Sequence, residues 1–297
     1  MDKKHSVSVI ITTSRELHTI SQSIEAVLPQ LSPSDELLII SPDNLGGIVK
    51  KYNKRNKHVR WIRDKGKGKP SALNLGFQKV HGDILILSDG DVFINKDALS
   101  YLTEPFGNVE VGAVSGHPVS IEKKDRMFGF WSHLLTDTAH QMRLRKSREN
   151  KFLECSGYLY AIRKGIVNRV PEDALAEDAV ISHIVADKGL KIKYAPQATV
   201  YVKYPKNYKD WLRQKVRSSG GYTQTYVTES PHKMRTPLYE ILSSPSIIIR
   251  YPEGFKEVIW TMALFLARVH LWILVAVKLH FLRQTLPNLW LRVESTK

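Results

Sequence analysis

One short run, DILILS at residues 83–88, constrains the fold most, because its central side chains are apolar in both alternating sets. A strand that faces water on one side alternates apolar and polar residues, whereas a strand covered on both sides is apolar throughout. The run therefore predicts a central parallel strand with helices packed on both faces of its sheet. Such a sheet needs a large core, and a chain of 297 residues, 42% of them hydrophobic, can supply one.

Apolar runs alternate with helical patterns on either side of this strand. Further strands are predicted over residues 7–13, 36–41, 58–63 and 111–119. Between them apolar residues recur at helical spacing, at Ile20, Ile24, Val27 and Leu28, and again at Leu73, Phe77 and Val80. Strands that alternate with helices indicate a doubly wound α/β fold.

The pattern becomes less regular beyond residue 120. A basic segment with aromatic residues, 126–151, suggests no particular element, and a helix is predicted over 176–189 with its end at Gly189. Two strands are predicted over 191–196 and 198–204, and a further helix begins at residue 207. We expect a first domain over 1–230 and a C-terminal helical region over 231–297.

The C-terminal region contains an apolar segment, 257–282, that is long enough to cross a bilayer. Arg268 and His270 lie near its middle, and a central arginine costs about 2.5–3.5 kcal/mol on insertion scales. We predict a helix that is embedded in a membrane or lies on its surface. The alternative is a helix packed on the domain or in an oligomer interface.

The net charge of +15 suggests an anionic partner: nucleic acid, an anionic membrane or a phosphorylated substrate. Basic stretches over 50–69 and 143–151 are spread over several predicted elements, and no nucleic-acid-binding motif is present. We therefore expect an anionic membrane surface and no nucleic acid. The single cysteine, Cys155, excludes an intramolecular disulfide and indicates a reducing compartment. The N-terminus lacks a long apolar region, so no export is predicted.

Two carboxylates follow the central strand, in SDGD at residues 88–91. Asp89 and Asp91 can converge if Gly90 lets the chain turn tightly. Ligands of open parallel sheets bind beyond the carboxyl ends of the strands. Two adjacent carboxylates repel each other unless a cation lies between them, and Mg²⁺ or Mn²⁺ takes oxygen ligands while bridging phosphates. The alternative is a solvated Asp-Gly-Asp turn.

Four signatures in order carry a family resemblance: VSVIITTS at 7–14, GKGKPSALNLGF at 66–77, SDGD, and AED at 176–178 followed by RQKVR at 213–217. Over residues 5–225 the sequence resembles the family 2 glycosyltransferases, whose GT-A fold is shared by the catalytic domains of cellulose and hyaluronan synthases. The resemblance implies a metal-dependent, inverting transfer of a sugar from a nucleoside diphosphate sugar, with UDP as the family-level nucleotide. Together with the apolar C-terminal segment, it predicts a lipid-linked or glycan acceptor at the cytoplasmic face of the cell membrane.

The resemblance implies a role for each residue that matches a family motif. The nucleotide and sugar site is assigned to Thr12, Thr13, Asp43, Lys69 and Asp89, and the metal to Asp91 and Asp89. Asp178 matches the general base, and Gln214 and Arg217 match a Gln-x-x-Arg signature beside the acceptor and diphosphate. The tryptophan that follows this arginine in polymer synthases is Ser218 here, which argues against processive extension.

Several of these residues also have a purely structural alternative. Asp178 suits the stabilisation of a helix N-terminus, Arg217 a solvated basic surface, and Asp43 an ordinary turn. A dinucleotide-binding oxidoreductase is disfavoured, because TTSREL follows the first strand where G-x-G-x-x-G is needed. A nucleotidyltransferase on a related fold remains an alternative, since it also uses a metal and a nucleotide at the strand ends.

Overall fold

The computed structural model describes residues 5–54, 56–232 and 245–277. The strands of these residues are β1 (Val7–Thr12), β2 (Glu36–Ser41), β3 (Val59–Arg63), β4 (Ile84–Asp89), β5 (Phe93–Ile94), β6 (Val111–Ser120), β7 (Leu159–Arg163) and β8 (Lys191–Val202). The α-helices are α1 (Ile20–Val27), α2 (Gly46–Asn53), α3 (Lys69–Lys79), α4 (Ala98–Thr103), α5 (Met127–Arg148), α6 (Glu177–Asp187), α7 (Tyr208–Gly221), α8 (Thr225–Thr228), α10 (Pro245–Arg250) and α11 (Phe255–Ala276). Two short 3₁₀ helices are η1 (Leu28–Gln30) and η2 (Glu104–Gly107).

The strands form one sheet in the order β3-β2-β1-β4-β7-β6-β8-β5. The pairs β1–β2, β1–β4, β2–β3 and β6–β8 are parallel, while β7 runs antiparallel to both β4 and β6, and β5 pairs antiparallel with β8. The prediction of a mostly parallel α/β sheet is confirmed. The chain leaves β1 toward β2 on one side and returns to β4 on the other, which makes the β1–β4 boundary the switch point where such sheets bind ligands.

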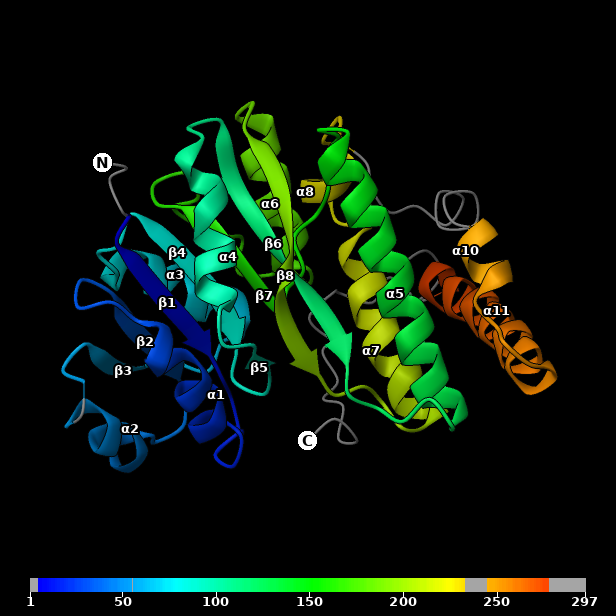
Figure 1. The fold of residues 1–297 in the computed structure, drawn as a ribbon, viewed down its shortest axis with the longest axis horizontal. Coiled ribbons are helices and arrows are strands. Elements are labelled where there is room, and N and C mark those ends of the chain that lie inside the picture. The colour runs from blue at the N-terminus through cyan, green and yellow to red at the C-terminus, as the bar shows by residue number, and fades with distance from the viewer. Residues whose placement is uncertain (1–4, 55, 233–244, 278–297) are drawn as a thin grey trace.

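Helices cover both faces of the sheet (Figure 1). On one face α1, α2 and α4 bury apolar side chains such as Ile24, Tyr52 and Leu102. On the other face α3 and α6 contribute residues such as Leu73 and Ile181. Ile84 to Leu87 in β4 are at most 1% exposed, because their alternating side chains enter these two cores in turn. A third cluster joins α5, α7 and α11 beside the sheet.

Local sequence explains where several predicted helices begin and end. The α1 pattern stops as an α-helix at Val27, because Pro29 follows and the chain continues as η1. Helix α3 begins at Lys69 after Gly68, whose φ of +102° suits glycine, and Pro70 lies in its first turn. Helix α6 ends at Asp187, with Gly189 at φ +75° shortly beyond, as predicted.

Two expectations need correction or completion. The strands predicted over 191–196 and 198–204 are one strand, β8, which ends at Val202. Its register against β6 shifts between the pairs Ser115–Tyr194 and His117–Thr199, so Pro196, which has no N–H to donate, lies in this irregular stretch. The basic segment 126–151 is mostly the long helix α5.

The apolar C-terminal segment forms helix α11, and residues 278–282 of the predicted span lie outside the described residues. One stripe of α11, with Leu264, Ala267, Leu271 and Val275, packs on α5 and α7. A residue on the opposite side, Leu266, is 67% exposed. The helix is long and apolar enough to cross a membrane, with a mean hydropathy of 1.9, and only 22% of its most apolar stretch is buried.

Candidate active site

The switch point brings the ends of β1 and β4 together. Thr12 and Asp89 are register partners, and the Gly90 N–H donates to the Thr12 carbonyl at 3.0 Å. The chain turns at Gly90 and Asp91, but Gly90 is not among the glycines with positive φ. The sequence suggested that this turn needs the conformational freedom of glycine, but its backbone conformation does not require it. It needs the space instead, because a Cβ on Gly90 would lie 2.4 Å from Thr13 Cβ.

Lys69 lies between two carboxylates that are far apart in the sequence. Its Nζ is 2.7 Å from Asp89 Oδ1 and 2.7 Å from Glu177 Oε1, and it donates to the Gly157 carbonyl at 3.0 Å. Lys69 is the first residue of α3 and so projects from the helix N-terminus toward the end of β4. The ammonium therefore links the paired aspartates to the start of α6.

The charge balance at Asp89 indicates that this part of the site suits a cation. Burial raises the pKa of Asp89 to about 6; Lys69 opposes the rise, and the negative charges of Asp91 and Glu177 add to it. Burial alone would lower the pKa of Lys69, but Asp89 and Glu177 hold it well above the usual lysine value. Asp91 and Glu177 thus both repel the Asp89 carboxylate, and an additional cation near Asp89 and Asp91 would relieve this repulsion.

The residues present fit an open divalent site rather than a closed metal centre. Among the residues that the structure describes, no group of three His, Cys, Asp or Glu side chains could hold a metal alone. A pair such as Asp89 and Asp91 leaves most positions of an octahedral Mg²⁺ or Mn²⁺ for substrate phosphates and water, which is how Mg²⁺ usually binds at phosphate sites.

The predicted base Asp178 lies in the first turn of α6, next to Glu177. Its Oδ1 accepts from the Ala179 N–H at 3.0 Å, as expected of a carboxylate at a helix N-terminus. On its other side, a Cβ added to Gly157 would lie 3.0 Å from Asp178 Oδ2. Gly157 thus touches both ends of this cluster: its carbonyl accepts from Lys69 and its α-carbon lies against Asp178.

Helix α7 carries Gln214 and Arg217 and begins at the Asn207 cap, whose side chain accepts from the Asp210 N–H. Burial raises the pKa of Tyr158; Asp89 and Asp91 add to this effect and Arg217 opposes it. The Arg217 charge therefore acts on the same tyrosine as the charges of the aspartate pair.

The residues expected to bind the base of the nucleotide lie after β2. The Asp43 carboxylate accepts from the Arg15 N–H, and the Asp43 N–H donates to Ser41 Oγ at 3.1 Å. Thr13 Oγ1 donates to Glu16 at 2.8 Å. Asp43 is thus held in a compact turn at the sheet edge of the site, and the Thr13 side chain is fixed by its hydrogen bond to Glu16.

Three buried polar atoms around the site have no hydrogen-bond partner among the described residues: Thr12 Oγ1, Gln214 Oε1 and the Tyr160 hydroxyl. Buried polar groups are normally paired, so each of these atoms suits a ligand group or a water molecule. Two of the three, Thr12 and Gln214, were assigned to substrate binding from the sequence. The third, Tyr160, was not.

Sequence reasoning missed Glu177 and Gly157 as parts of this site. The adjacent acidic pair in AED was a signal for Glu177, because two neighbouring carboxylates favour a cation close by. No local signal marks the carbonyl of Gly157 as the partner of Lys69, since the two residues are 88 positions apart.

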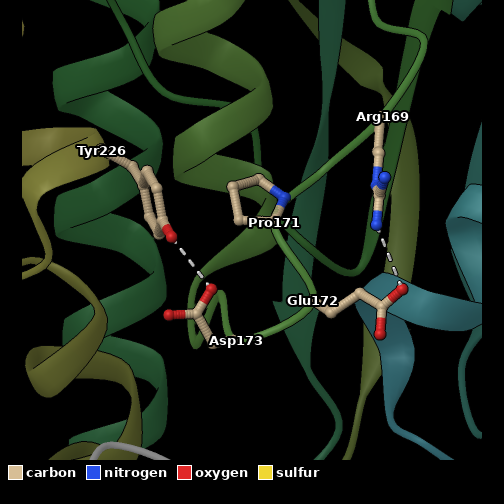
Figure 2. A pocket seen from close by; sticks show the side chains of 5 residues that line it. All are labelled: Arg169, Pro171, Glu172, Asp173 and Tyr226. Atoms are coloured by element: carbon tan, nitrogen blue, oxygen red, sulfur yellow. Dashed lines mark hydrogen bonds and ion pairs between the residues drawn. The ribbon is translucent and has the colours of Figure 1, made fainter.

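A separate pocket of about 600 Å³ is lined by Arg169, Pro171, Glu172, Asp173 and Tyr226. Figure 2 shows these five side chains. The pocket lies between the loop before α6 and helix α8. Its polar groups satisfy one another: the Tyr226 hydroxyl donates to Asp173 at 3.0 Å, and Arg169 lies 3.4 Å from Glu172. None of the residues assigned from the sequence lines it.

Comparisons with known proteins agree with this architecture. The family described as glycosyl transferase family 2 matches residues 8–170. A probable glycosyltransferase, YdaM, of Bacillus subtilis is 30% identical over 230 residues, which cover 72% of this chain and 54% of that protein. The poly-beta-1,6-N-acetyl-D-glucosamine synthase of Staphylococcus aureus is 24% identical over 260 residues, which cover 84% of this chain and 63% of that protein. The matched regions thus span less than two thirds of these relatives.

Solved structures share the fold. The mannosyltransferase PcManGT from Pyrobaculum calidifontis, in complex with GDP-Man and Mn²⁺, aligns with a TM-score of 0.63 at 18% identity, covering 97% of this chain and 84% of that one. GalNAc-T7 with UDP, GalNAc and Mn²⁺ aligns with a TM-score of 0.54 at 15% identity, covering 83% of this chain and 58% of that one.

The sheet, its switch-point carboxylates and these structural neighbours define a GT-A glycosyltransferase fold, as expected from the sequence. The chain belongs to glycosyl transferase family 2.

Proposed function

We propose that this protein transfers a sugar from a nucleoside diphosphate sugar to a hydroxyl acceptor. One observation carries the proposal: Lys69 joins Asp89, at the nucleotide edge of the sheet, to Glu177, which is adjacent to Asp178. Groups suited to binding a diphosphate and a carboxylate suited to taking a proton thus belong to one connected cluster. GDP-Man and UDP, each with Mn²⁺, are bound by the two structural neighbours.

The donor would lie along the ends of β2, β1 and β4, with Asp43 toward the base and Thr12 and Thr13 beneath the nucleotide. A divalent ion held by Asp91 and Asp89 would neutralise the charge that grows on the departing diphosphate. Lys69 and Arg217 supply further positive charge on the acceptor side of that group. Preorganised contacts of this kind are each worth a few kcal/mol in a transition state.

Asp178 is the proposed general base, which takes the proton of the attacking hydroxyl. Because the hydroxyl attacks from the side opposite the leaving diphosphate, the transfer inverts the anomeric centre. Gln214, whose Oε1 is buried with no hydrogen-bond partner among the described residues, is suited to binding a hydroxyl of the acceptor. Its helix carries Ser218 after Arg217, which supports one transfer per encounter rather than processive extension.

We further propose that residues 1–230 form the catalytic unit and that 231–297 bring it to the cytoplasmic face of a membrane carrying a lipid-linked or glycan acceptor. The exposed side of α11 supports this part, with Met262 and Leu266 at 64% and 67% exposure. Exposed cations flank the helix start, among them Lys123, Lys124 and Lys256, and such charges attract anionic lipid headgroups.

The test is release of nucleoside diphosphate from a panel of UDP-sugars and GDP-mannose, with and without Mn²⁺. Asp91→Ala should lose Mn²⁺-dependent donor binding, whereas Asp178→Ala should bind the donor and fail to transfer. Asp97→Ala removes an exposed aspartate at the start of α4 and should stay active. Pyrophosphate made from a nucleoside triphosphate would instead identify a nucleotidyltransferase, and normal turnover by Asp178→Ala would refute the proposed base.

A further inference from the structure

Tyr160 is a buried hydroxyl at the site that the proposed chemistry leaves without a role. It lies in β7, between Leu87 of β4 and Ser115 of β6. The side chain is fully buried, at 0% exposure, and its hydroxyl has no hydrogen-bond partner among the described residues. An unpaired buried hydroxyl is costly to a folded protein, so its presence two positions from Tyr158 in the same strand region and opposite Leu87, shortly before Asp89, calls for an explanation.

The charges of Lys69, Glu177 and Asp178 act on this hydroxyl. Burial raises the pKa of Tyr160 well above the usual tyrosine value; Lys69 opposes the rise, and Glu177 and Asp178 add to it. The hydroxyl therefore keeps its proton at neutral pH and can act as a hydrogen-bond donor. The acceptors whose charges act on it are the two carboxylates at the start of α6.

The position of Lys69 determines when the carboxylates at the start of α6 need a hydrogen bond from Tyr160. Its ammonium lies 2.7 Å from Glu177 and 2.7 Å from Asp89. A divalent ion beside Asp89 would repel this ammonium, and the donor diphosphate would attract it. Glu177, whose side chain is 11% exposed, would then lose its cation, and a buried carboxylate without a donor is strongly disfavoured.

We propose that Tyr160 is a positioning residue whose hydroxyl donates to the Glu177–Asp178 carboxylate pair once the donor substrate has drawn Lys69 toward its phosphates. The inference rests on the proposed function. It makes the tyrosine a substitute donor, so that the base is held in place during transfer rather than in the empty enzyme. A hydrogen bond from a hydroxyl to a carboxylate is short and strong, which suits this holding role.

Tyr194 provides a matched comparison. It belongs to the same core cluster, on the neighbouring part of the sheet in β8, and is 6% exposed. Its hydroxyl does have a partner, because it lies 2.7 Å from His140 Nδ1 on α5. Removing the hydroxyl of Tyr160 should therefore lower activity but not stability, whereas removing that of Tyr194 should lower stability but not activity.

The experiment compares Tyr160→Phe and Tyr194→Phe by thermal unfolding of the ligand-free protein and by steady-state release of nucleoside diphosphate. Tyr160→Phe should unfold at or above the wild-type temperature, because it removes an unpaired hydroxyl. Its kcat should fall about 10- to 100-fold, the loss of a hydrogen bond to a charged group, with KM for the donor within about twofold. Tyr194→Phe should unfold about 2–4 °C lower and keep its kcat.

Either of two results overturns the role of Tyr160: wild-type kcat in Tyr160→Phe, or a lower unfolding temperature, which would mean that the hydroxyl is already bonded in the empty enzyme. A wild-type protein that releases no diphosphate from any donor would instead overturn the proposed function, and this inference with it. If the wild type is active and Tyr160→Phe is equally active, only the role proposed for Tyr160 is overturned.

Discussion

Replacing Lys69 with methionine tests whether one ammonium holds the site together. Methionine keeps an unbranched apolar stem and removes the charge, so Asp89 and Glu177 lose the cation that lies 2.7 Å from each. Removing one partner of a fully buried ion pair costs about 3–5 kcal/mol. The three side chains are 20%, 24% and 11% exposed, and this partial solvation lowers the expected loss to roughly 2–4 kcal/mol.

The loss should depend on pH, with a sign fixed by Asp89. Burial raises its pKa to about 6 in the folded protein, against an ordinary value of 3.8. An acid with a raised pKa contributes most to stability below the unfolded pKa, and the contribution is lost as pH rises through the folded pKa. Without Lys69, which lowers the pKa of Asp89, that carboxyl should stay protonated to higher pH. The variant's deficit should thus be smaller at pH 5 and largest at pH 8.

Urea unfolding of wild type and Lys69→Met at pH 5, 7 and 8 measures this directly. Lys79→Met is the control, because Lys79 is exposed at the other end of the same helix and should cost less than about 0.5 kcal/mol. A deficit below that level for Lys69→Met at pH 8, or an equal deficit at pH 5 and pH 8, would refute the idea that the ammonium is retained to pair these carboxylates.

Three further substitutions have equally definite outcomes. Gly90→Ala would bring a Cβ to 2.4 Å from Thr13, so it should cost about 1–3 kcal/mol and abolish the thermal shift given by nucleotide sugar with Mn²⁺; an unchanged shift would contradict the need for space at this turn. Burial alone would raise the pKa of Glu36, but hydrogen bonds from Ser8, the His81 N–H and Arg60 bring it below 4.5. Glu36→Gln should therefore destabilise by about 1–2 kcal/mol at pH 7, and the difference should shrink as pH falls below 4.5 in urea titrations. Leu266→Glu should reduce flotation with anionic vesicles, while Val109→Glu, at a 78% exposed site away from α11, should not; equal flotation would exclude α11 as the lipid-binding element.

The sheet could be predicted because the residue composition of a strand indicates which of its faces are buried. Ile84 to Leu87 are apolar at every position, and only a strand covered on both sides tolerates that pattern. Helix α5 could not be predicted in this way. Its fully buried apolar residues, such as Trp131 and Leu134, lie in the first half, whereas the second half buries the cations Arg143 and Lys146. Those side chains donate to the carbonyls of Glu154 and Phe152, partners that only the folded chain brings near.

The candidate site was predictable to the extent that each residue belongs to a local signature. SDGD follows an expected strand and AED begins an expected helix. Ligands of such sheets bind beyond the carboxyl ends of the strands. What joins the two signatures was not predictable. The Lys69–Glu177 ion pair spans more than one hundred residues, and nothing in GKGKP selects one acidic residue among the 29 in the chain.

Close backbone approach, more than turn geometry, explains how these elements reach one point. Gly90 leaves no room for a side chain against Thr13, and a Cβ on Gly221 would lie 2.6 Å from Ala176 Cβ, the residue before Glu177. Neither glycine has a positive φ, so neither is required by its own backbone conformation. Each is required by a neighbour: the first lets β4 deliver its aspartates beside β1, and the second lets α7 dock against the start of α6. Because a glycine in a sequence usually indicates a turn, contacts of this kind are read correctly only once the partner surface is known, and they set the spacing between the donor side and the acceptor side of the site.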